Sequence, residues 1–592
     1  MASGKPAILI VGSGPAGLVL ALTLLKNGIP VRIIEQNASF HEGARGTAIQ
    51  PRTQELLNFL GIIDETMKWT EEAESCPQIP FSQVASTSQA QLEKILRRHI
   101  ENLGAHVELG VTLTGVEQTA DTVTARLTSK GVEELFECQY IVGADGAKGI
   151  VKKLLGLPFV GQTKTADRIL TANVDVKDFN REYWDMWGSF STASIGLKPL
   201  EPPPLFQLQA VGPNLPAILP VDPVGVQDLF NSITGSTDIK LENVCCVTDW
   251  RANIRMVQSF SVGRVFLAGD SAHCHSPAGG QGGNTAMQDS FNLAWKLSLV
   301  IRRLAPATLL ETYALERMPV VAEMLNLSTE LHSLAFPQLD SSSLEAGKAP
   351  RVEDVMFRPR SFLQLGINYR WSSIVIDERG GEGEGKGPET PQEISPYGSG
   401  VDKLRAGDRA PDATVLLDGS DSMTLHGVFS VRNHTVLVFP GTADGTELQS
   451  DLATVGVFRK PGVASLVLIS QTKHAQFRDI STVCDRVLVD TAGHATSGYG
   501  ILDDTKAFVV IRPDGIIGAY VLAAEGVIRY FSNILNLLYT VHERDTGEDA
   551  YRSDTAVWFE RSPSPYRRCP ICSARDDTHD TGEDVHRSDT AV

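Results

Sequence analysis

The chain has few cysteines for its length and no apolar stretch long enough to cross a membrane. Only eight of its 592 residues are cysteine, and they are scattered along the chain. Sparse, scattered cysteine is typical of a reducing compartment, so we expect a cytoplasmic protein without a disulfide framework. No run of about 18 apolar residues occurs, which predicts no membrane span. Glycines interrupt the apolar N-terminal segment, which argues against a signal peptide.

Basic residues are also in the minority. Lys and Arg number 53 against 71 Asp and Glu, which gives a net charge of -18 at pH 7. Without a basic tract, neither nucleic acid nor an anionic membrane is expected as the main partner. A Gly-x-Ser-x-Gly elbow and a Walker loop are missing too, which argues against serine hydrolases and P-loop nucleotidases. The remaining composition, 42% hydrophobic and 21% charged, is that of a globular protein of two or three domains.

Two groups of metal-ligating residue types are present, and neither predicts a metal site. His273–His275 reads His-Cys-His, but no carboxylate or third histidine stands at ligand spacing on the same element. Cys569 and Cys572 form a Cys-x-x-Cys, with His579 and His586 as further potential ligands. This pair lies in a polar tail, outside any β-α-β pattern, and we interpret it as inert.

The pattern of apolar residues predicts an α/β fold. At the N-terminus, a strand over 7–12, a helix over 16–28 and a strand over 30–36 form one β-α-β unit, which implies a parallel sheet. A helix is predicted over 89–104 from apolar residues that repeat on one face. Alternating residues follow this helix and are typical of antiparallel strands.

Four regions follow one another along the chain. They are a first region over 1–376 with β-rich parts at about 80–115 and 165–260, a flexible Gly-, Glu- and Pro-rich linker over 377–400, an α/β region over 401–540, and a polar tail over 541–592. The tail contains the pattern TGED-x-x-RSDTAV twice, at 546–557 and 581–592. It has no core-forming pattern, so we predict that it is disordered.

The sequence GSGPAG, residues 12–17, joins the first strand to the first helix. Gly12 allows the tight turn, Gly14 lets the backbone approach a pyrophosphate, and Gly17 lets the helix pack on the strand. The free N–H groups of the helix N-terminus favour phosphate. Glu35 ends the second strand, where a carboxylate accepts hydrogen bonds from a ribose. The motif predicts a dinucleotide site without separating FAD from NAD.

Two further acidic residues end apolar strands. Asp145 and Gly146 follow YIVGA, a pattern that on its own is better explained by a plain β-turn. Asp270 ends RVFLAGD, and a Gly-rich loop and a helix that starts near Asn284 come next.

These three motifs, in this order and spacing, resemble the single-component flavoprotein aromatic hydroxylases, a family that includes para-hydroxybenzoate hydroxylase and phenol hydroxylase. The resemblance covers roughly residues 5–335 and includes Tyr313, Glu316, Arg317 and Pro319 of a Tyr-x-x-Glu-Arg-x-Pro pattern. It implies a Rossmann-type FAD-binding domain with an inserted β-rich substrate domain. The region from GDRAPD onward resembles the thioredoxin-like domain of phenol hydroxylase, so we expect a C-terminal thioredoxin-like α/β domain over 401–540.

The resemblance assigns FAD contacts to residues on several segments. These are Gly12, Gly14, Pro15, Ala16, Gly17, Glu35 and Gln36 around the ADP half, Arg45 at the flavin, Gln89 near the ribityl chain and pyrophosphate, Asp145 at both FAD and the nicotinamide donor, Asp270 at the ribityl chain, and Pro277, Gly280, Gly283 and Asn284 at the isoalloxazine. A helix that begins beside the flavin stabilises its reduced, anionic form. Gly149, Lys152 and Gly283 stand where relatives commonly have Ser, Arg, and Leu or Met.

The same resemblance implies a reaction. NADPH, or NADH, reduces the flavin, O₂ forms a C4a-hydroperoxyflavin, and one oxygen atom is transferred to a phenolic ring. A hydroxybenzoate substrate makes oxidative decarboxylation an additional outcome. Two alternatives stay open: an epoxidase or Baeyer–Villiger monooxygenase of secondary metabolism, and a non-catalytic flavin-binding protein. The residue that ionises the phenol is not identified, and a homodimer is left open.

Aromatic residues near the predicted substrate domain are candidates for its pocket. The segment REYWDMW contains Tyr183 and Trp187, and Phe206 and Gln207 follow on a later strand. A structural role in the core is an equally good interpretation of these side chains.

Overall fold

The computed structural model describes residues 6–43, 46–66, 76–190, 192–276, 278–335, 360–379, 390–398, 403–417, 421–471, 483–502 and 504–536. The predicted tail with Cys569 and Cys572 lies outside the described residues, as do Arg45, Pro277 and half of the predicted linker, residues 380–389 and 399–400. Among the described helices, none combines the length and the apolarity that crossing a membrane requires.

The first sheet has six strands in the order β15-β16-β9-β1-β2-β5. The strands are β15 (Ser261–Val262), β16 (Val265–Leu267), β9 (Tyr140–Gly143), β1 (Ile8–Val11), β2 (Val31–Glu35) and β5 (Val107–Leu109). All neighbours except β15 and β16 run parallel. This confirms the parallel sheet and the β-α-β unit expected at the N-terminus.

Helices pack beside this sheet because their apolar faces need cover. They are α1 (Pro15–Lys26), α2 (Pro51–Phe59), α3 (Ile63–Thr66), α4 (Gln89–Asn102), α5 (Val151–Leu154), α7 (Gly282–Ile301) and α8 (Glu311–Ala335). Ser88 caps α4 by accepting a hydrogen bond from the Gln91 amide. Helix α7 packs against α1, and the Ser290 hydroxyl donates to the Ala16 carbonyl at 2.8 Å.

The second sheet is mostly antiparallel, in the order β11-β12-β13-β10-β14-β17. Its strands are β11 (Asp185–Gly188), β12 (Ser194–Pro199), β13 (Leu205–Val211), β10 (Phe159–Asp175), β14 (Glu242–Val257) and β17 (His273–Cys274), and α6 (Pro223–Thr234) packs on one face. The prediction of β structure over 165–260 holds. The β-rich assignment of 80–115 is wrong for this sheet, because α4 occupies most of that range and β5 pairs into the first sheet.

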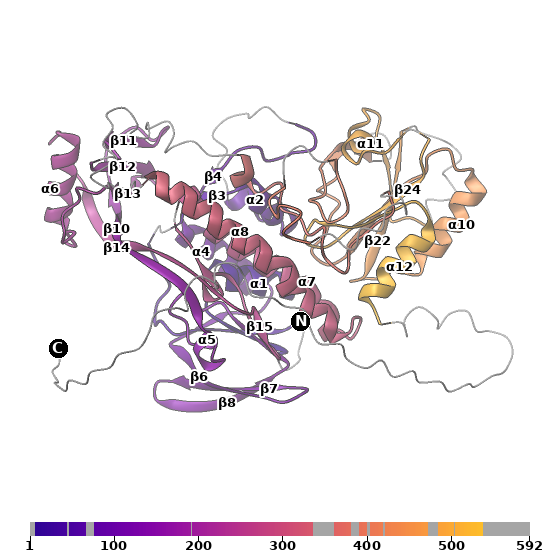
Figure 1. The fold of residues 1–592 in the computed structure, drawn as a ribbon, viewed down its shortest axis with the longest axis horizontal. Helices are drawn as coiled ribbons and strands as arrows, with labels where there is room; N and C mark the ends of the chain where they lie inside the picture. Colours follow the sequence, from indigo (N-terminus) through magenta and orange to yellow (C-terminus); the bar gives the residue numbers. More distant parts are fainter. Residues whose placement is uncertain are drawn as a thin grey trace, which may run out of the picture. The chain divides into compact units, whose positions relative to one another are not determined.

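Two small sheets complete the first region. β6 (Val111–Gln118), β7 (Val123–Ser129) and β8 (Val132–Cys138) form an antiparallel meander, seen at the bottom of Figure 1. β3 (Ala48–Ile49) pairs with β4 (Ala85–Ser86).

The C-terminal sheet has eight strands in the order β18-β25-β24-β21-β22-β23-β19-β20. They are β18 (Ile376–Asp377), β25 (Ile517–Val521), β24 (Ala507–Ile511), β21 (His434–Phe439), β22 (Ala464–Ser470), β23 (Arg486–Val489), β19 (Thr414–Leu417) and β20 (Asp421–Thr424). β21, β22 and β23 run parallel, whereas β24 and β25 are antiparallel additions. Helices α10 (Gly445–Gly456) and α12 (Ala524–Ile534) pack together beside it (Figure 1), and α11 (His494–Gly498) follows β23.

A buried charge network joins this C-terminal sheet to α7 and α8. Its charged members are Asp289, Lys296, Glu316, Arg317, Arg512 and Asp514. Glu316 accepts from both terminal nitrogens of Arg512, at 2.8 and 2.9 Å, and from Lys296 Nζ at 2.8 Å. Three acids balance three bases, so the network is neutral as a whole. The charges are thereby compensated where water cannot solvate them.

Candidate functional site

Four strand ends meet at one edge of the first sheet. β1, β2, β9 and β16 run parallel, so the residues after them lie side by side. These are Gly12 after β1, Glu35 at the end of β2, Asp145 after β9 and Asp270 after β16. The edge at the carboxyl ends of parallel strands is where open α/β sheets bind ligands. The sheet thus brings together three motifs that lie far apart in the sequence.

The glycines of GSGPAG have the environments that a tight strand-turn-helix requires. Gly12 has a φ of 108°, and a Cβ there would lie 2.3 Å from the Ala144 carbonyl oxygen, beside Asp145. A Cβ on Gly17 would lie 2.1 Å from the Gly12 carbonyl oxygen, so only glycine allows the helix this close. A Cβ on Gly14 would meet nothing within 4 Å. Gly14 therefore faces open space, where a phosphate group can approach the backbone.

The N-terminus of α1 faces that open space. Gly14 is the N-cap and carries no capping side chain, while Pro15 and Ala16 start the helix. The first amides of a helix without a capping side chain, together with the helix dipole, form an anion site. On the neighbouring strand, the Glu35 carboxylate accepts from the amide and hydroxyl of Ser13, both at 3.2 Å. Gln36 is exposed beside it.

Asp145 is held tightly against the backbone after β9. Its Oδ2 accepts from the Val151 amide at 2.9 Å, and burial raises its pKa. A Cβ on Gly149 would lie 2.2 Å from the Asp145 carboxyl carbon. Gly149, which stands where relatives commonly have Ser, thus leaves the space that the Asp145 carboxyl group occupies. Lys152 donates to the Gly146 carbonyl at 3.0 Å and braces the same turn.

Asp270 lies in the short 3-10 helix η1 (Gly269–Ser271) that follows β16, and its side chain is exposed. The turn below it is fixed by buried groups. Asp289 accepts from the Gly269 amide at 3.0 Å, and Ser271 donates to the Gly143 carbonyl at 2.5 Å. Asp270 therefore lies on a hydrogen-bonded turn at the ligand edge of the sheet.

The histidines of the His-Cys-His sequence have structural partners. His273 Nε2 lies 2.8 Å from Asp289 Oδ2, and its ring stacks on Phe260. His275 Nδ1 lies 2.5 Å from the Ser276 carbonyl oxygen, and a Cβ on Gly282 would overlap its ring. No cluster of three metal-ligating side chains occurs among the described residues.

The Gly-rich loop over 278–284 packs against β3. Asn284 is buried and donates to the carbonyls of Ala48 and Gly280, at 2.9 and 2.7 Å, while its Oδ1 accepts from the Gln50 amide. Helix α7 begins at Gly282, two residues before the predicted start, and no side chain caps it. A Cβ on Gly283 would meet nothing within 4 Å. Among the glycines of this loop, Gly283 alone faces open space, where the flat face of a flavin ring can approach the backbone.

Gln89 is the first residue of α4, and its Nε2 donates to Glu93 at 2.8 Å. Arg45 and Pro277 lie outside the described residues, so their predicted contacts stay predictions.

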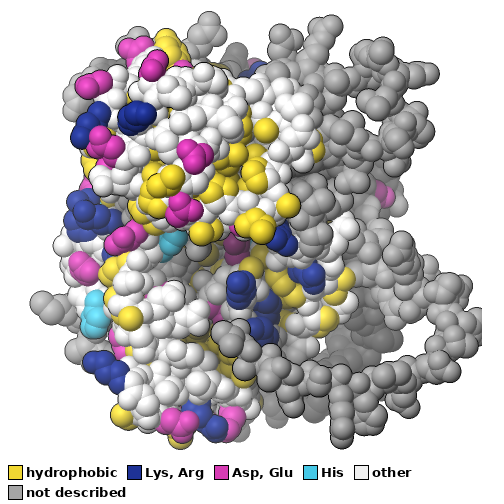
Figure 2. Space-filling view, turned by 90° about the vertical axis from the view of Figure 1, so that its left-hand side faces the viewer, with side chains coloured by type: hydrophobic (Ala, Val, Ile, Leu, Met, Phe, Trp, Pro, Cys, Tyr) yellow, Lys and Arg dark blue, Asp and Glu magenta, His cyan; other side chains and the backbone are white. Residues whose placement is uncertain are grey.

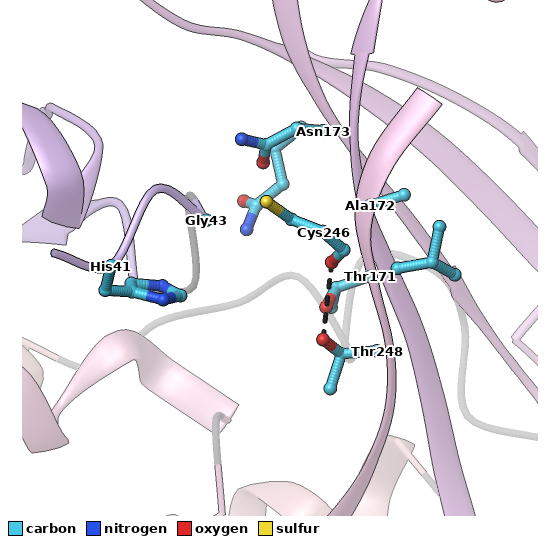
Figure 3. A pocket seen from close by; sticks show the side chains of 9 residues that line it. His41, Gly43, Thr171, Ala172, Asn173, Cys246 and Thr248 are labelled. Atoms are coloured by element: carbon cyan, nitrogen blue, oxygen red, sulfur yellow. Dashed lines mark hydrogen bonds between the residues drawn. The ribbon is translucent and has the colours of Figure 1, made fainter. Parts of the chain in front are cut away.

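A cavity of about 240 Å³ lies between the second sheet and the loop that precedes Arg45. Figure 3 shows His41 and Gly43 on one side and Asn173, Cys246 and Thr171 on the other. Gln207 also lines it. Its walls thus come from both the β-rich part and the FAD-motif part of the chain, which is the arrangement that a substrate pocket beside a cofactor needs.

Of the four predicted substrate residues, only Gln207 lines this cavity. Phe206 is fully buried on the opposite face of β13, in the core under α6, and Trp187 packs against Phe179 and Phe230. Tyr183 is 65% exposed. Figure 2 shows that hydrophobic side chains gather on the upper part of the face that it draws. Phe206 therefore belongs to the core, because adjacent strand residues face opposite sides. Trp187 is half-buried against the same core.

Sequence reasoning missed the other cavity residues. His41, Asn173 and Cys246 lie on a loop and two strands that are distant in the sequence. The alternation of polar residues with buried apolar ones along β10 and β13 is the signal that marks the polar face of this sheet.

The geometry fits FAD better than a mononucleotide. Three features lie at one sheet edge. They are an uncapped helix N-terminus with open space at Gly14, an acid at the next strand end, and a second uncapped helix N-terminus at Gly282. They provide places for a pyrophosphate, a ribose and an extended flavin.

Comparison with known proteins agrees with this geometry. The sequence family described as "FAD binding domain" matches residues 5–328. A flavin-dependent monooxygenase of Mycobacteroides abscessus is 30% identical over 569 residues, which cover 89% of this chain and 100% of the relative. Pentachlorophenol 4-monooxygenase of Sphingobium chlorophenolicum is 27% identical, over 87% of this chain and 94% of the relative.

Solved structures share the fold. The flavin-dependent monooxygenase PieE, in complex with FAD and substrate, superimposes with a TM-score of 0.71 at 22% identity, over 90% of this chain and 99% of the other. Aklavinone-11 hydroxylase, in a ternary complex with FAD and aklavinone, gives 0.69 at 24% identity, over 90% and 100%.

Proposed function

The chain belongs to the FAD binding domain family of flavin-dependent monooxygenases, and from that premise we propose that it hydroxylates a phenolic aromatic compound with NADPH and O₂. FAD is its cofactor, and its relatives are enzymes. Relatives named for pentachlorophenol and for 6-methylpretetramide support an aromatic substrate that carries hydroxyl groups. The preference for NADPH rests on the resemblance to the aromatic hydroxylases.

The observation that carries the proposal is the position of the cavity. It opens between the second sheet and the His41–Gly43 loop, and this loop leads into β3, on which the 278–284 loop packs. A substrate in the cavity is therefore beside the place where the flavin ring is expected.

Bound FAD supplies the activation of O₂ and the transfer of one oxygen atom to the ring. The chain's own residues bind and shield the reactants. The amides at the start of α1 bind the phosphates, Glu35 accepts from the ribose, and Asp270 accepts from the ribityl chain. The first turn of α7 stabilises negative charge on the flavin, by about 0.3–1 kcal/mol when exposed and up to ~2 when partly buried. The cavity walls keep bulk water from the reacting atoms.

The first experiment uses the purified, FAD-loaded enzyme with a panel of phenols under ¹⁸O₂. We expect NADPH oxidation that phenols stimulate and products that contain one labelled oxygen atom. Release of CO₂ from a hydroxybenzoate would add oxidative decarboxylation to the activity. Oxygen insertion into ketones or alkenes alone would replace aromatic hydroxylation by a Baeyer–Villiger or epoxidase activity. Flavin absorbance without NADPH oxidation across all panels would contradict the proposal.

Asp270→Ala tests the assignment of the ribityl contact. Because the Asp270 side chain is exposed and its turn is fixed by other groups, we expect a folded protein with weaker FAD binding. The measurement is the FAD dissociation constant, by flavin fluorescence, with Asp121→Ala on an exposed turn as the control. An unchanged constant for Asp270→Ala would remove this residue from the site.

We also propose that residues 401–540 form a thioredoxin-like domain with a structural role. The parallel β21-β22-β23 strands with antiparallel β24 and β25 support this topology. Cys484 is buried, and burial raises its pKa to about 12, so its reactive thiolate form is scarce at neutral pH. Disulfide exchange by Cys484 is therefore not expected, and Cys484→Ser should keep full turnover in the phenol assay.

A further inference from the structure

A lysine on the second sheet faces the FAD-binding part of the chain. Lys198 lies on β12 and pairs in register with Gln207 of β13, which pairs with Asn173 of β10. Side chains paired across neighbouring strands point to the same face of a sheet. Gln207 and Asn173 both line the cavity, so Lys198 extends the same polar face by one strand.

The Lys198 ammonium reaches the segment that supports the Gly-rich loop. Its Nζ donates to the buried hydroxyl of Thr47 at 2.9 Å. The next residue, Ala48, accepts from Asn284 and lies against Gly280. Lys198 therefore connects the sheet face that carries Gln207 and Asn173 to the segment beside the expected position of the flavin ring.

Lys198 has no ion-pair partner among the described residues. The Trp184 ring lies 5.7 Å from Nζ. Titratable side chains on the neighbouring elements include His41 and the exposed Glu42 on the loop and Cys246 on β14. Burial lowers the pKa of Lys198 to about 8. Lys198 is half-buried. A cation that is largely removed from water without a counter-charge is costly, and an anionic group on a ligand would compensate it.

We propose that Lys198 binds the ring oxygen of the phenolic substrate in its ionised form. The proposal rests on the proposed function and identifies the group that activates the ring. When Nζ is neutral, the phenol O–H bond breaks, the proton forms a new N–H bond on Nζ, and the electron pair stays on oxygen. When Nζ is already an ammonium, it holds the phenolate directly. Either route leaves an electron-rich ring beside a cation, with Thr47 accepting one ammonium hydrogen.

The test measures ionisation of a bound phenol, without turnover. FAD-loaded enzyme without NADPH is mixed with 4-nitrophenol, and the phenolate absorbance is followed against pH. An opposite charge at contact distance shifts a pKa by about one to three units, so the bound phenol should ionise that much below the free phenol. Lys198→Met should remove the shift, whereas Lys198→Arg, which keeps the charge, should retain most of it. Lys177→Met, which changes an exposed lysine beside Glu242, is the control and should behave as wild type.

Steady-state kinetics give a second readout. With the substrate found in the phenol panel, Lys198→Met should lower kcat/KM most at low pH, where the free phenol is protonated. A wild-type protein that leaves the 4-nitrophenol spectrum unchanged, or a Lys198→Met variant with the wild-type shift, would overturn the proposal. Turnover of phenols by that same Lys198→Met variant would leave the hydroxylase function intact. A wild-type shift without any turnover would instead refute the hydroxylase function alone.

Discussion

Replacing Glu316 by Gln removes one of three negative charges from the buried charge network between α7, α8 and the C-terminal sheet. The carboxylate is fully buried and accepts from Arg512, Lys296, Asn292 and Ser372. The variant keeps the shape but leaves a net positive charge, and the amide nitrogen of Gln faces donors. Removing one partner of a buried ion pair costs about 3–5 kcal/mol.

The destabilisation by Glu316→Gln has two parts, one at Lys296 and one at Arg512. Burial lowers the pKa of Lys296 from 10.5 to about 8, so keeping Lys296 charged at pH 7 costs about 3 kcal/mol. Without Glu316 its pKa falls further, and a fully neutral Lys296 costs about 5 kcal/mol at pH 7. The additional loss at Lys296 is thus limited to about 1–2 kcal/mol. The rest comes from Arg512, which cannot release its proton.

This division predicts a pH dependence with a definite sign. Between the folded and unfolded pKa values of Lys296, the unfolded chain binds more protons, so this lysine destabilises the fold less as pH rises. At pH 9 the lysine is mostly neutral in both proteins, and its share of the difference disappears. The deficit of Glu316→Gln should therefore be smaller at pH 9 than at pH 7, by up to about 1–2 kcal/mol.

Urea unfolding of the FAD-loaded proteins, followed by circular dichroism and by flavin fluorescence, measures the deficit. Glu447→Gln is the matched control, because Glu447 is an exposed acid that pairs with Lys506 and should contribute at most about 1 kcal/mol. A Glu316→Gln deficit below about 1 kcal/mol, or one that grows toward pH 9, would refute the reasoning.

The glycines of the site give three further predictions. Gly282→Ala should destabilise the loop and release FAD, since its Cβ would overlap the His275 ring, whereas Gly283→Ala, which meets nothing within 4 Å, should change the urea midpoint little. Equal losses of flavin absorbance in these two variants would contradict the placement of the loop. Gly149→Ser restores the residue common in relatives, yet its Cβ would lie 2.2 Å from the Asp145 carboxyl carbon. Gly149→Ser should therefore weaken FAD binding if Asp145 keeps its position. An unchanged FAD dissociation constant and an unchanged KM for NADPH would show that the Asp145 side chain moves.

The parts of the fold that depend on local pattern were predictable from the sequence. GSGPAG identified the strand-turn-helix, and each of its glycines has the environment that its position predicted. Asp145 and Asp270 were singled out as residues after strands, although only the parallel pairing of β9 and β16 with β1 shows why they meet. Such pairing depends on contacts between distant segments, which periodicity alone does not encode.

The substrate side was predicted less well, for a physical reason. Aromatic residues were chosen for their size, but on β13 the residue that faces the cavity is Gln207, next to the buried Phe206. Which face of a strand meets the cofactor depends on how two sheets pack. Lys198 was overlooked because a single lysine in a strand looks like a solvent-exposed residue, and only its burial and its bond to Thr47 distinguish it.

Helix α7 connects the C-terminal region to the expected flavin site. Its first turn lies at the expected flavin, Asp289 fixes the turn of Asp270, and Trp295 and Leu299 belong to the hydrophobic core of the C-terminal sheet. With 20 residues, the helix is a rod about 30 Å long that both regions hold. The C-terminal region is therefore an integral part of the structure that positions this helix. A protein cut after α8 would expose one end of this rod to water and lose the alignment of the other.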